Sequence, residues 1–561
     1  MRDDVNKNIK QATKTKFSGT YTLKVEKPTE VSILLFIRQT LAALGPMLST
    51  VCIGITVGYS AILLAQLQKN TQFSEGSRAN ILIGTTNDES WLAASGALLM
   101  SPGCWLSGIL MEFFGRRVTH LIISPIFCLA WVAIGLAPNR PTLIFGRLLC
   151  GLCVGLQAPL GPVYVAEISE PQLRGILLSA ISLAVSIGIL FVHVVGSFVS
   201  WENTALISMV FPILCFLICL NAPESPSWLL KKHKSTLARE SWIYLRGLDS
   251  FEEFEKIGLA EQNNTRLQDV EPTCNYSKQN NSEAHGTSEL TIVECGVGAR
   301  TVQEEPNVKS IVESIQSITQ EQSTSISNIH QNDHNSQKQK IKSVKRLFNI
   351  WTNAMFWKPL IILNIFFFVA QFSGVNVLSF YCVQLLKEVM TSTENSYLAT
   401  ILVDLVRVLA SVLACWMTKK FSRRFLAITS ATGASLSLLI LSGVMFWNMA
   451  TSWIPLFLLL IFVCAVSIGL VPLPWLLCGE IFPTPVRALG TGISSACAFI
   501  YFFAVVRLGP FMLKDLGSPC TFFIFGLITL IGTCLLYFFL PETKDKTLTD
   551  IGRYFQKKND V

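Results

Sequence analysis

Three charged motifs occur twice in this chain, in the same order and at nearly the same separation. Side chains of opposite charge at such spacings can form ion pairs that hold helix ends together reversibly. The first copy has Glu112-Phe-Phe-Gly-Arg116-Arg117, Glu167 with Arg174, and Pro223-Glu224-Ser225. The second copy has Lys419-Lys-Phe-Ser-Arg423-Arg424, Glu480 with Arg487, and Pro541-Glu542-Thr543. Because apolar stretches of spanning length separate the motifs, we predict two related halves that each cross a bilayer several times, with a binding site between them.

The composition indicates a membrane protein. The chain has 561 residues, of which 51% are hydrophobic and 15% charged, and its mean hydropathy is +0.47. These values exclude an ordinary soluble domain, in which about 25% of residues are charged. Apolar windows of about 20 residues predict about twelve spans, near 41–66, 91–111, 118–136, 143–165, 176–199, 204–221, 359–386, 397–417, 425–447, 453–478, 488–511 and 520–540.

The basic residues indicate membrane orientation rather than nucleic-acid binding. The formal charge is +8, but Lys and Arg lie mainly in alternate loops instead of on one basic face. They gather in the first 27 residues, in the loops with Arg116, Arg174 and Arg423, and in the tail after Lys544. By the positive-inside rule, we predict that both termini and the central loop are cytosolic.

The predicted spans divide the chain into five parts. These are an N-terminal cytosolic segment at 1–40, a six-helix bundle at 41–221, a long cytosolic linker at 222–358, a second six-helix bundle at 359–540 and a cytosolic tail at 541–561. The middle of the linker is rich in Asn, Gln, Ser and Glu, a composition typical of disorder. Its ends, 236–257 and 344–357, carry apolar residues at helical spacing and predict amphipathic helices under the membrane domain.

The repeated charges are predicted to close the cytosolic mouth when the halves meet. The predicted gate set is Glu112, Arg116, Arg117, Glu167, Arg174, Glu224, Arg423, Arg424, Glu480, Arg487 and Glu542. For any one of these residues, a charge that merely sets membrane orientation at a helix end is an equally good explanation. Their repetition in both halves favours a role in gating.

Pairs of glycines at four-residue spacing predict close packing between helices. Gly54 with Gly58, and Gly151 with Gly155, would each present a smooth strip to a neighbouring helix. We interpret both pairs as packing features only.

Further motifs resemble a known family. They are Gly146-Arg147, Pro162-x-Tyr164-x-x-Glu167, Pro223-Glu224-Ser225-Pro226-x-Trp228, Gln371-Phe-Ser373-Gly374-x-Asn376, Pro472-x-Pro474-Trp475 and Pro541-Glu542-Thr543-Lys544. With them the chain resembles the sugar porter family of the major facilitator superfamily over essentially the whole membrane domain. Within that family, the segment from Gly58 to Leu67 resembles the facilitated trehalose transporters of insects. The resemblance implies an all-α membrane protein whose two pseudo-symmetric six-helix bundles work by alternating access.

The resemblance also implies a sugar site near the membrane midplane. Gln371 and Asn376 match family sugar ligands, and their amides offer donors and acceptors to a ring of hydroxyls. Trp475 matches the tryptophan beneath the sugar, while Phe380 and Tyr381 match the aromatic pair of the outer gate. Without the family register, helix packing or interface anchoring would be the better explanation of such residues. The predicted substrate-binding set is Gln371, Asn376, Trp475, Arg407, Ser182 and Ser373.

Several positions depart from the family pattern. Ser182 stands where a sugar-binding Gln is usual, Ala370 replaces the first of a Gln pair, and Ala498-Phe499 replace Asn-Trp. Several hydroxyl partners are therefore missing, and an unpaired polar group in a dry site costs about 1–3 kcal/mol. We expect that water fills the gaps or that the cargo differs from the usual one.

Arg407 is the largest departure, because family members carry Asn or Gln at its position. Asp404 precedes it by one helical turn. An ionisable pair inside a membrane is expensive and is functional by default. Two explanations stay open: a salt bridge within one helix, or an Arg407 that faces the cavity and binds an anionic or highly hydroxylated cargo.

Ser60 favours facilitated diffusion. Proton-linked sugar porters carry an Asp at this position of the first span, and a hydroxyl cannot cycle a proton at physiological pH. Asp404 is the residual candidate for coupling, although Arg407 should keep it ionised.

The sequence therefore predicts uniport of a sugar, trehalose or a hexose, across the plasma membrane by a monomer. Two alternatives stay open, a non-transporting sugar sensor and a porter of a non-sugar organic anion or polyol that uses Arg407. We expect no enzyme, no cofactor, no metal and no nucleic-acid partner. The six histidines show no ligand spacing within a span, and no nucleophile-base signature is present.

Overall fold

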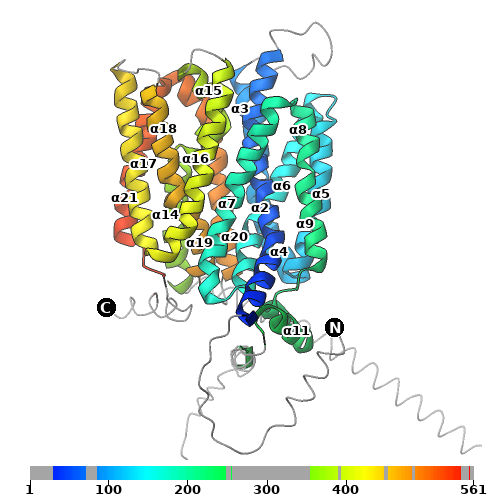
Figure 1. Ribbon diagram of the computed structural model, residues 1–561. Helices are drawn as coiled ribbons and strands as arrows, with labels where there is room; N and C mark the ends of the chain where they lie inside the picture. The colour runs from blue at the N-terminus through cyan, green and yellow to red at the C-terminus, as the bar shows by residue number, and fades with distance from the viewer. Residues whose placement is uncertain are drawn as a thin grey trace, which may run out of the picture.

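The described chain folds into long α-helices that stand side by side in two groups (Figure 1). The computed structural model describes residues 30–70, 85–247, 250, 254–255, 354–389, 393–447, 453–482, 487–544 and 555. The first group is drawn from blue to green and the second from yellow-green to red. An all-α fold was predicted from the repeated apolar spans, and it is confirmed.

The first group makes six crossings. It contains α2 (Glu30–Asn70), α3 (Thr86–Leu98), α4 (Met100–Phe114), α5 (Arg116–Gly135), α6 (Arg140–Ile168), α7 (Pro171–Phe198), α8 (Trp201–Ser208) and α9 (Val210–Asn221). One residue separates α3 from α4 and α8 from α9, so each of these pairs forms a single crossing. Helix α2 begins at Glu30, inside the segment that we expected to precede the membrane domain.

The second group repeats this plan with more interruptions. It contains α14 (Ala354–Gln371), α15 (Val375–Val389), α16 (Thr393–Lys420), α17 (Arg423–Phe446), α18 (Trp453–Ala465), the π-helical turn η2 (Val466–Leu470), α19 (Pro472–Glu480), α20 (Arg487–Phe511), a second π-helical turn η3 (Met512–Leu516) and α21 (Gly517–Phe539). The breaks after Gln371 and at η2 fall inside single crossings, where exposed backbone would be costly in lipid unless protein surrounds it.

The described helices make twelve crossings. Eleven stretches of described helix are long and apolar enough to span a membrane. One of them, Leu489–Phe539, has 51 residues. A helix of that size would be about 75 Å long, against a hydrocarbon core of about 30 Å. The turn η3 separates α20 from α21, and α21 begins at Gly517 with a φ of +78°, so this stretch crosses twice.

A short amphipathic helix lies beneath the first group, as the sequence predicted for one end of the linker. Helix α10 (Pro226–Lys231) leads into α11 (Ser235–Arg246), which lies below the long helices in Figure 1. Trp242 and Leu245 of α11 are buried, and the guanidinium of Arg246 donates to the Ser169 carbonyl at 2.9 Å. The helix ends at Gly247, which has a φ of +74°. Most of the second predicted helix, 344–357, lies outside the described residues.

Glycines bring the helices of the first half into contact, as predicted. A Cβ atom at Gly54 would lie 2.0 Å from the Val185 carbonyl oxygen, and one at Gly58 would lie 2.7 Å from the Val192 side chain. At Gly151 and Gly155 of α6, a Cβ atom would lie 2.1 and 2.0 Å from the carbonyl oxygens of Gly96 and Met100. Backbone atoms cannot move aside as a flexible side chain can, so the contacts at Gly54, Gly151 and Gly155 require glycine.

We expect Gly155→Ala to destabilise the protein by about 1–3 kcal/mol, because the new methyl group must push α6 away from Met100 of α4. Gly108→Ala is the matched control, since a Cβ atom there would meet nothing within 4 Å. Thermal unfolding of both variants in detergent measures the difference. Equal melting temperatures of the two variants would show that the contact between α4 and α6 is not tight.

Candidate substrate cavity and its gates

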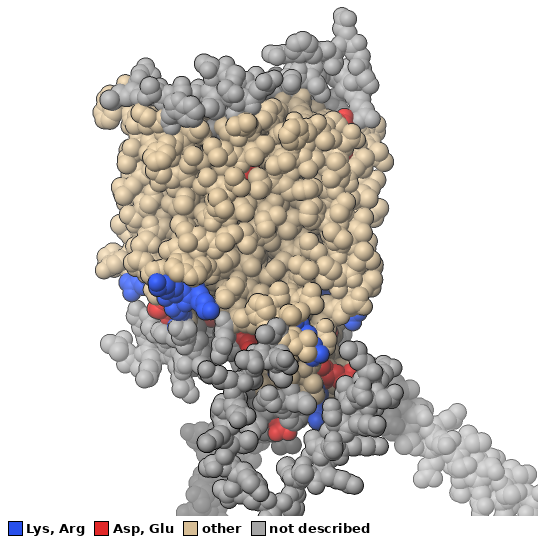
Figure 2. Space-filling model, in the orientation of Figure 1, with Lys and Arg blue, Asp and Glu red and all other residues tan. Residues whose placement is uncertain are grey.

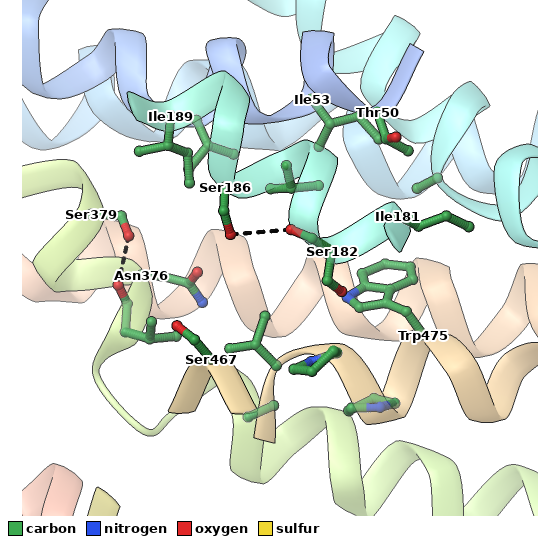
Figure 3. A pocket seen from close by; sticks show the side chains of 18 of the residues that line it. Thr50, Ile53, Ile181, Ser182, Ser186, Ile189, Asn376, Ser379, Ser467 and Trp475 are labelled. Carbon is green, nitrogen blue, oxygen red and sulfur yellow. Dashed lines mark hydrogen bonds between the residues drawn. The ribbon is translucent and has the colours of Figure 1, made fainter. Parts of the chain in front are cut away.

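A cavity of about 150 Å³ lies between the two halves. Helices α2, α6 and α7 line it from the first half, and α14, α15, α16, η2, α19 and α20 line it from the second. Figure 3 shows Ser182, Ser186 and Ile189 of α7 on one side, with Asn376 and Trp475 on the other. Most of the lining side chains are apolar, and a few hydroxyl, amide and guanidinium groups interrupt them, which is the usual character of a small-molecule site.

Gln371 and Asn376 both line the cavity. The break between α14 and α15 positions them: Gln371 ends one helix, Asn376 lies in the first turn of the next, and Gly374 has a φ of +88°. Asn376 Nδ2 donates a hydrogen bond to Gln371 Oε1. The two amides therefore hold each other in place while keeping a donor on Gln371 and an acceptor on Asn376 for another group.

Ser373, which the sequence placed in the substrate-binding set, is not among the lining residues. It is fully buried, and its hydroxyl donates to the Ala370 carbonyl at 2.7 Å. It stabilises the turn between α14 and α15. Ser182 does line the cavity, from α7.

Trp475 lines the cavity from α19, just after the π-helical turn η2. Proline lacks a backbone N–H, so Pro472 and Pro474 interrupt the regular helical hydrogen bonds. Ser430 of α17 stabilises the irregular turn by donating to the Ala465 carbonyl at 2.6 Å and accepting from Leu470 N at 2.7 Å. The indole is held edge-on by Phe367, with ring centroids 4.9 Å apart.

Phe380 and Tyr381 are buried beside the cavity, where α15 departs from helical geometry at Tyr381. The Tyr381 hydroxyl donates to the Val506 carbonyl of α20 at 3.3 Å. Phe380 packs edge-on against Phe502, which itself lines the cavity, with centroids 5.4 Å apart. A kinked helix with a buried aromatic pair is a feature that could move with a ligand.

Arg407 lines the cavity from α16, and a partner that sequence analysis missed lies near it. Its Nη1 atom is 3.4 Å from Asp404 Oδ1, and the Asp404 carboxylate also bonds to Nδ1 of His193 on α7. Nε2 of His193 lies 3.0 Å from the Gly58 carbonyl oxygen of α2. Arg407 therefore pairs within its own helix and also faces the cavity.

The charged motifs of the first half bind one another within that half. Arg116 Nη2 lies 2.8 Å from Glu167 Oε1, and the Ser225 hydroxyl donates to the other oxygen of Glu167 at 2.5 Å. Glu224 accepts hydrogen bonds from the backbone N–H groups of Arg116 and Arg117. Glu112 pairs instead with Lys231, at 3.1 Å and half-exposed.

The second half repeats the contacts of Arg116, Glu167 and Glu224. Arg423 Nη2 lies 3.3 Å from Glu480 Oε1, and Thr543 donates to Glu480 Oε2 at 3.0 Å. Glu542 accepts from the backbone N–H groups of Arg423 and Arg424, at 3.0 and 3.1 Å. Partial burial raises the pKa of Glu542, but backbone donors led by Lys544, Arg424 and Arg423 outweigh it and leave the pKa below the usual value.

This pattern differs from the expected pairing across the closed mouth. The ion pairs of Arg116 and Arg423 each tie together helices of one half, so they stiffen the halves separately. Between the halves, the Arg423 guanidinium approaches Gly175 of α7, where a Cβ atom would lie 3.1 Å from Nη2. Arg174 lies near the start of α7, and the side chain of Arg487 lies outside the described residues.

Three polar pairs join the halves along α7 and α16. Ser179 bonds to Thr418 and Ser186 to Ser411, both at 2.9 Å between hydroxyl oxygens, and His193 bonds to Asp404. Each pair lies seven residues from the next on both helices, which run antiparallel. We call these three pairs the α7·α16 seam.

Arg507 joins the halves at the opposite end from the charged motifs. Its guanidinium donates to the Ser90 hydroxyl and to Asn87 Oδ1, the latter at 2.6 Å, and stacks over Trp91 at 4.7 Å from the ring centre. The Ser90 hydroxyl donates in turn to the Arg507 carbonyl at 2.7 Å. Contacts between the halves are therefore present at both ends of the cavity.

Arg147 is fully buried in the first half, where it donates to the Ser60 hydroxyl at 2.6 Å and to the Ala93 carbonyl at 3.1 Å. Ser60 is the position at which proton-linked relatives were expected to carry Asp. The hydroxyl offers Arg147 a hydrogen bond without a titratable charge.

A cluster of soft ligands lies in the first half, away from the cavity. His120, Cys215 and Cys219 are buried, and their ligand atoms lie within 4.8 Å of one another. Neither ring nitrogen of His120 has a hydrogen-bond partner among the described residues. Two thiols and an imidazole suit a soft metal ion, so the expectation of no metal, which rested on spacing within single spans, overlooked contacts between α5 and α9.

The fold is shared with solved transporters of the major facilitator class. Over 93% of this chain and 99% of the other, the structure matches the MFS proton:xylose symporter XylE bound to 6-bromo-6-deoxy-D-glucose, with a TM-score of 0.68 and 20% identity. It matches the human organic anion transporter MFSD10 over 91% of this chain and 100% of the other, with a TM-score of 0.53 and 12% identity. At these identities, the matches establish the fold.

The family follows from the sequence itself. The model of the family "Sugar (and other) transporter" matches residues 41–274 and 302–555. The chain therefore belongs to this family, a family of membrane transporters rather than enzymes, and the predicted resemblance is confirmed.

Curated relatives agree with this membership. The facilitated trehalose transporter Tret1 of Drosophila grimshawi is 27% identical over 95% of this chain and 49% of its own length. Tret1 of Polypedilum vanderplanki is 27% identical over 95% of this chain and 91% of its own length. The chain thus spans about half the length of the first of these relatives.

Proposed function

We propose that this protein moves a sugar down its gradient across the plasma membrane by alternating access. The observation that carries the proposal is the cavity between the halves, walled by the Gln371–Asn376 amide pair and the Trp475 ring. Amides match the hydroxyls of a sugar ring and an aromatic face matches its C–H surface. The trehalose transporters among its relatives support a sugar as the class of cargo.

The size of the cavity favours a single sugar ring. A buried water molecule needs at least about 10–15 Å³ of cavity volume. The cavity of about 150 Å³ therefore holds roughly ten waters, enough for a hexose in this closed form. A disaccharide such as trehalose would require the halves to move apart while it is bound.

The proposals of uniport and of the orientation in the membrane rest on separate features of the molecule. Ser60 gives Arg147 a neutral partner, so this buried position has no carboxyl group to carry a proton. Charged side chains gather at one end of the molecule, and only isolated acidic atoms are visible on the flank above them (Figure 2). By the positive-inside rule, this end would face the cytosol, and both termini would lie there. We also propose that the protein acts as a monomer.

The test is uptake of labelled glucose and labelled trehalose by proteoliposomes that contain the full chain. We expect uptake at similar rates at pH 6 and pH 8, and an about tenfold fall for Asn376→Ala, the value of one hydrogen bond in a dry site. Asn203→Ala is the matched control, because Asn203 is exposed on α8. Sugar binding without uptake would indicate a sensor, and equal uptake by both variants would remove Asn376 from the site.

A further inference from the structure

The guanidinium of Arg407 is a buried positive charge at the cavity wall whose hydrogen-bonding capacity is unfilled. Its side chain is 6% exposed, and Nε and Nη1 have no hydrogen-bond partner among the described residues. Nη1 lies near Asp404, but at 3.4 Å the contact is a loose ion pair. A guanidinium has five donors and stays protonated, so the group calls for an acceptor that this wall does not supply.

Asp404 cannot neutralise Arg407, because it is already neutralised by a proton shared with His193. Both ring nitrogens of His193 face acceptors: Nδ1 faces the Asp404 carboxylate, and Nε2 faces the Gly58 carbonyl oxygen. A carbonyl only accepts, so Nε2 must carry a hydrogen. A second proton must then lie between Nδ1 and the carboxylate. Whichever atom holds that proton, His193 and Asp404 together have a net charge of zero.

The three side chains of this cluster, His193, Asp404 and Arg407, therefore carry one net positive charge beside the cavity. The Cys382 thiol of α15 also lies near this cluster, and α2 contributes the Gly58 carbonyl oxygen. An unbalanced charge in the interior of a membrane protein is expensive. A counter-charge in the cavity would remove this cost, and a carboxylate suits a guanidinium because it can accept two parallel hydrogen bonds.

We propose that the cargo is a sugar that carries a carboxylate, such as a hexuronate, with the carboxylate at Arg407. Its hydroxyls would face the free donor and acceptor of Gln371 and Asn376, with the ring against Trp475. This inference rests on the proposed function and specifies its cargo. It also accounts for the sugar-binding amides that this chain lacks at Ser182 and Ala370, since one charged contact replaces several neutral ones.

The experiment is equilibrium binding of labelled glucuronate, glucose and lactate to the purified full chain in lipid nanodiscs, with glucose uptake measured in parallel. We expect glucuronate to bind about tenfold or more tightly than glucose, since hydrogen bonds to a charged group contribute about twice as much as neutral ones. Arg407→Gln should abolish that preference, and Arg407→Lys should keep part of it. Arg140→Gln, which removes a half-exposed arginine paired with Asp88, should keep the whole preference.

The outcomes separate the two proposals. Uptake of glucose with no preference for glucuronate would overturn the charged-cargo inference and leave sugar transport standing. Failure to bind or move either sugar would overturn sugar transport, and the inference with it. Lactate binding as tightly as glucuronate would show that the cavity recognises a carboxylate alone. That result would also overturn the proposal that the cargo is a sugar acid. Because the wild-type comparison needs no variant, a misfolded Arg407→Gln protein would not prevent a decision.

Discussion

A disulfide between positions 179 and 418 is expected to stop transport completely and reversibly. In Ser179→Cys/Thr418→Cys, the two sulfur atoms would replace hydroxyl oxygens that lie 2.9 Å apart across the α7·α16 seam. A disulfide needs about 2.05 Å between sulfurs, so a small side-chain adjustment closes it. Alternating access requires the halves to separate at this end of the cavity, and a covalent link there forbids it. Uptake of labelled sugar should fall to the level of empty vesicles on oxidation and recover on reduction.

Controls for this experiment come from the chain itself. Cys415 lies one turn from Thr418 on α16, so the pair is best made in a Cys415→Ala background to remove a competing thiol. Each single cysteine variant should keep its uptake under the same oxidant. If mass spectrometry shows full cross-linking while uptake continues, the seam does not open during transport, and rocking of the halves is the wrong description.

The seam also suggests how the closed form divides its stability. The two pairs nearer the charged motifs, Ser179–Thr418 and Ser186–Ser411, are neutral hydroxyl pairs, each contributing about 0.5–1.5 kcal/mol. The pair farther away joins His193 to Asp404, and Arg507 adds another charged contact at that far end. Because a buried contact that involves an ionisable pair, such as His193–Asp404, is costlier to break than a neutral one, opening on the side of the charged motifs should need less energy than opening on the other.

Local patterns predicted the helices and the close contacts well. Twelve crossings followed from apolar windows alone, since a helix in lipid must satisfy its own backbone and needs a spanning length. The glycines at 151 and 155 indicated packing because their spacing fixes one helix face, whatever the neighbour. Gln371, Asn376 and Trp475 were found by family resemblance. No periodicity in the sequence distinguishes a cavity amide from a packing amide.

Contacts between distant helices were beyond the reach of the sequence. Spacing along the chain offers no partner for His193, because Asp404 lies on a helix of the other half. Positions 179, 186 and 193 of α7 pair with positions 418, 411 and 404 of α16, respectively. This seven-residue repeat becomes visible only when the register of the two antiparallel helices is known. The same limit explains why the pairing of the gate motifs was not predicted. Their repetition is visible in the sequence, but the packing of the helix ends decides whether the charges pair within a half or between the halves.

The ion pairs that remain within each half give the second large expectation. Glu167→Ala should lower the free energy of unfolding by about 3–5 kcal/mol, because it leaves Arg116 buried without its carboxylate. The Arg116 and Glu167 side chains are only 8% and 12% exposed, and they lie 2.8 Å apart. The Ser225 hydroxyl would lose its acceptor as well. Denaturation in mixed micelles, followed by tryptophan fluorescence, measures the change.

Glu112→Ala is the matched control for this expectation, because it removes a carboxylate from the same end of the molecule. Its partner is Lys231 at 3.1 Å, and the two side chains are 45% and 44% exposed. Solvent screens such a pair, so we expect a loss of about 0–1 kcal/mol. Glu480→Ala should resemble Glu167→Ala, since Arg423 is equally buried and its pair is only slightly longer. Were Glu112→Ala and Glu167→Ala to cost the same, burial would not be what gives the repeated pairs their strength, and the halves could not owe their rigidity to them.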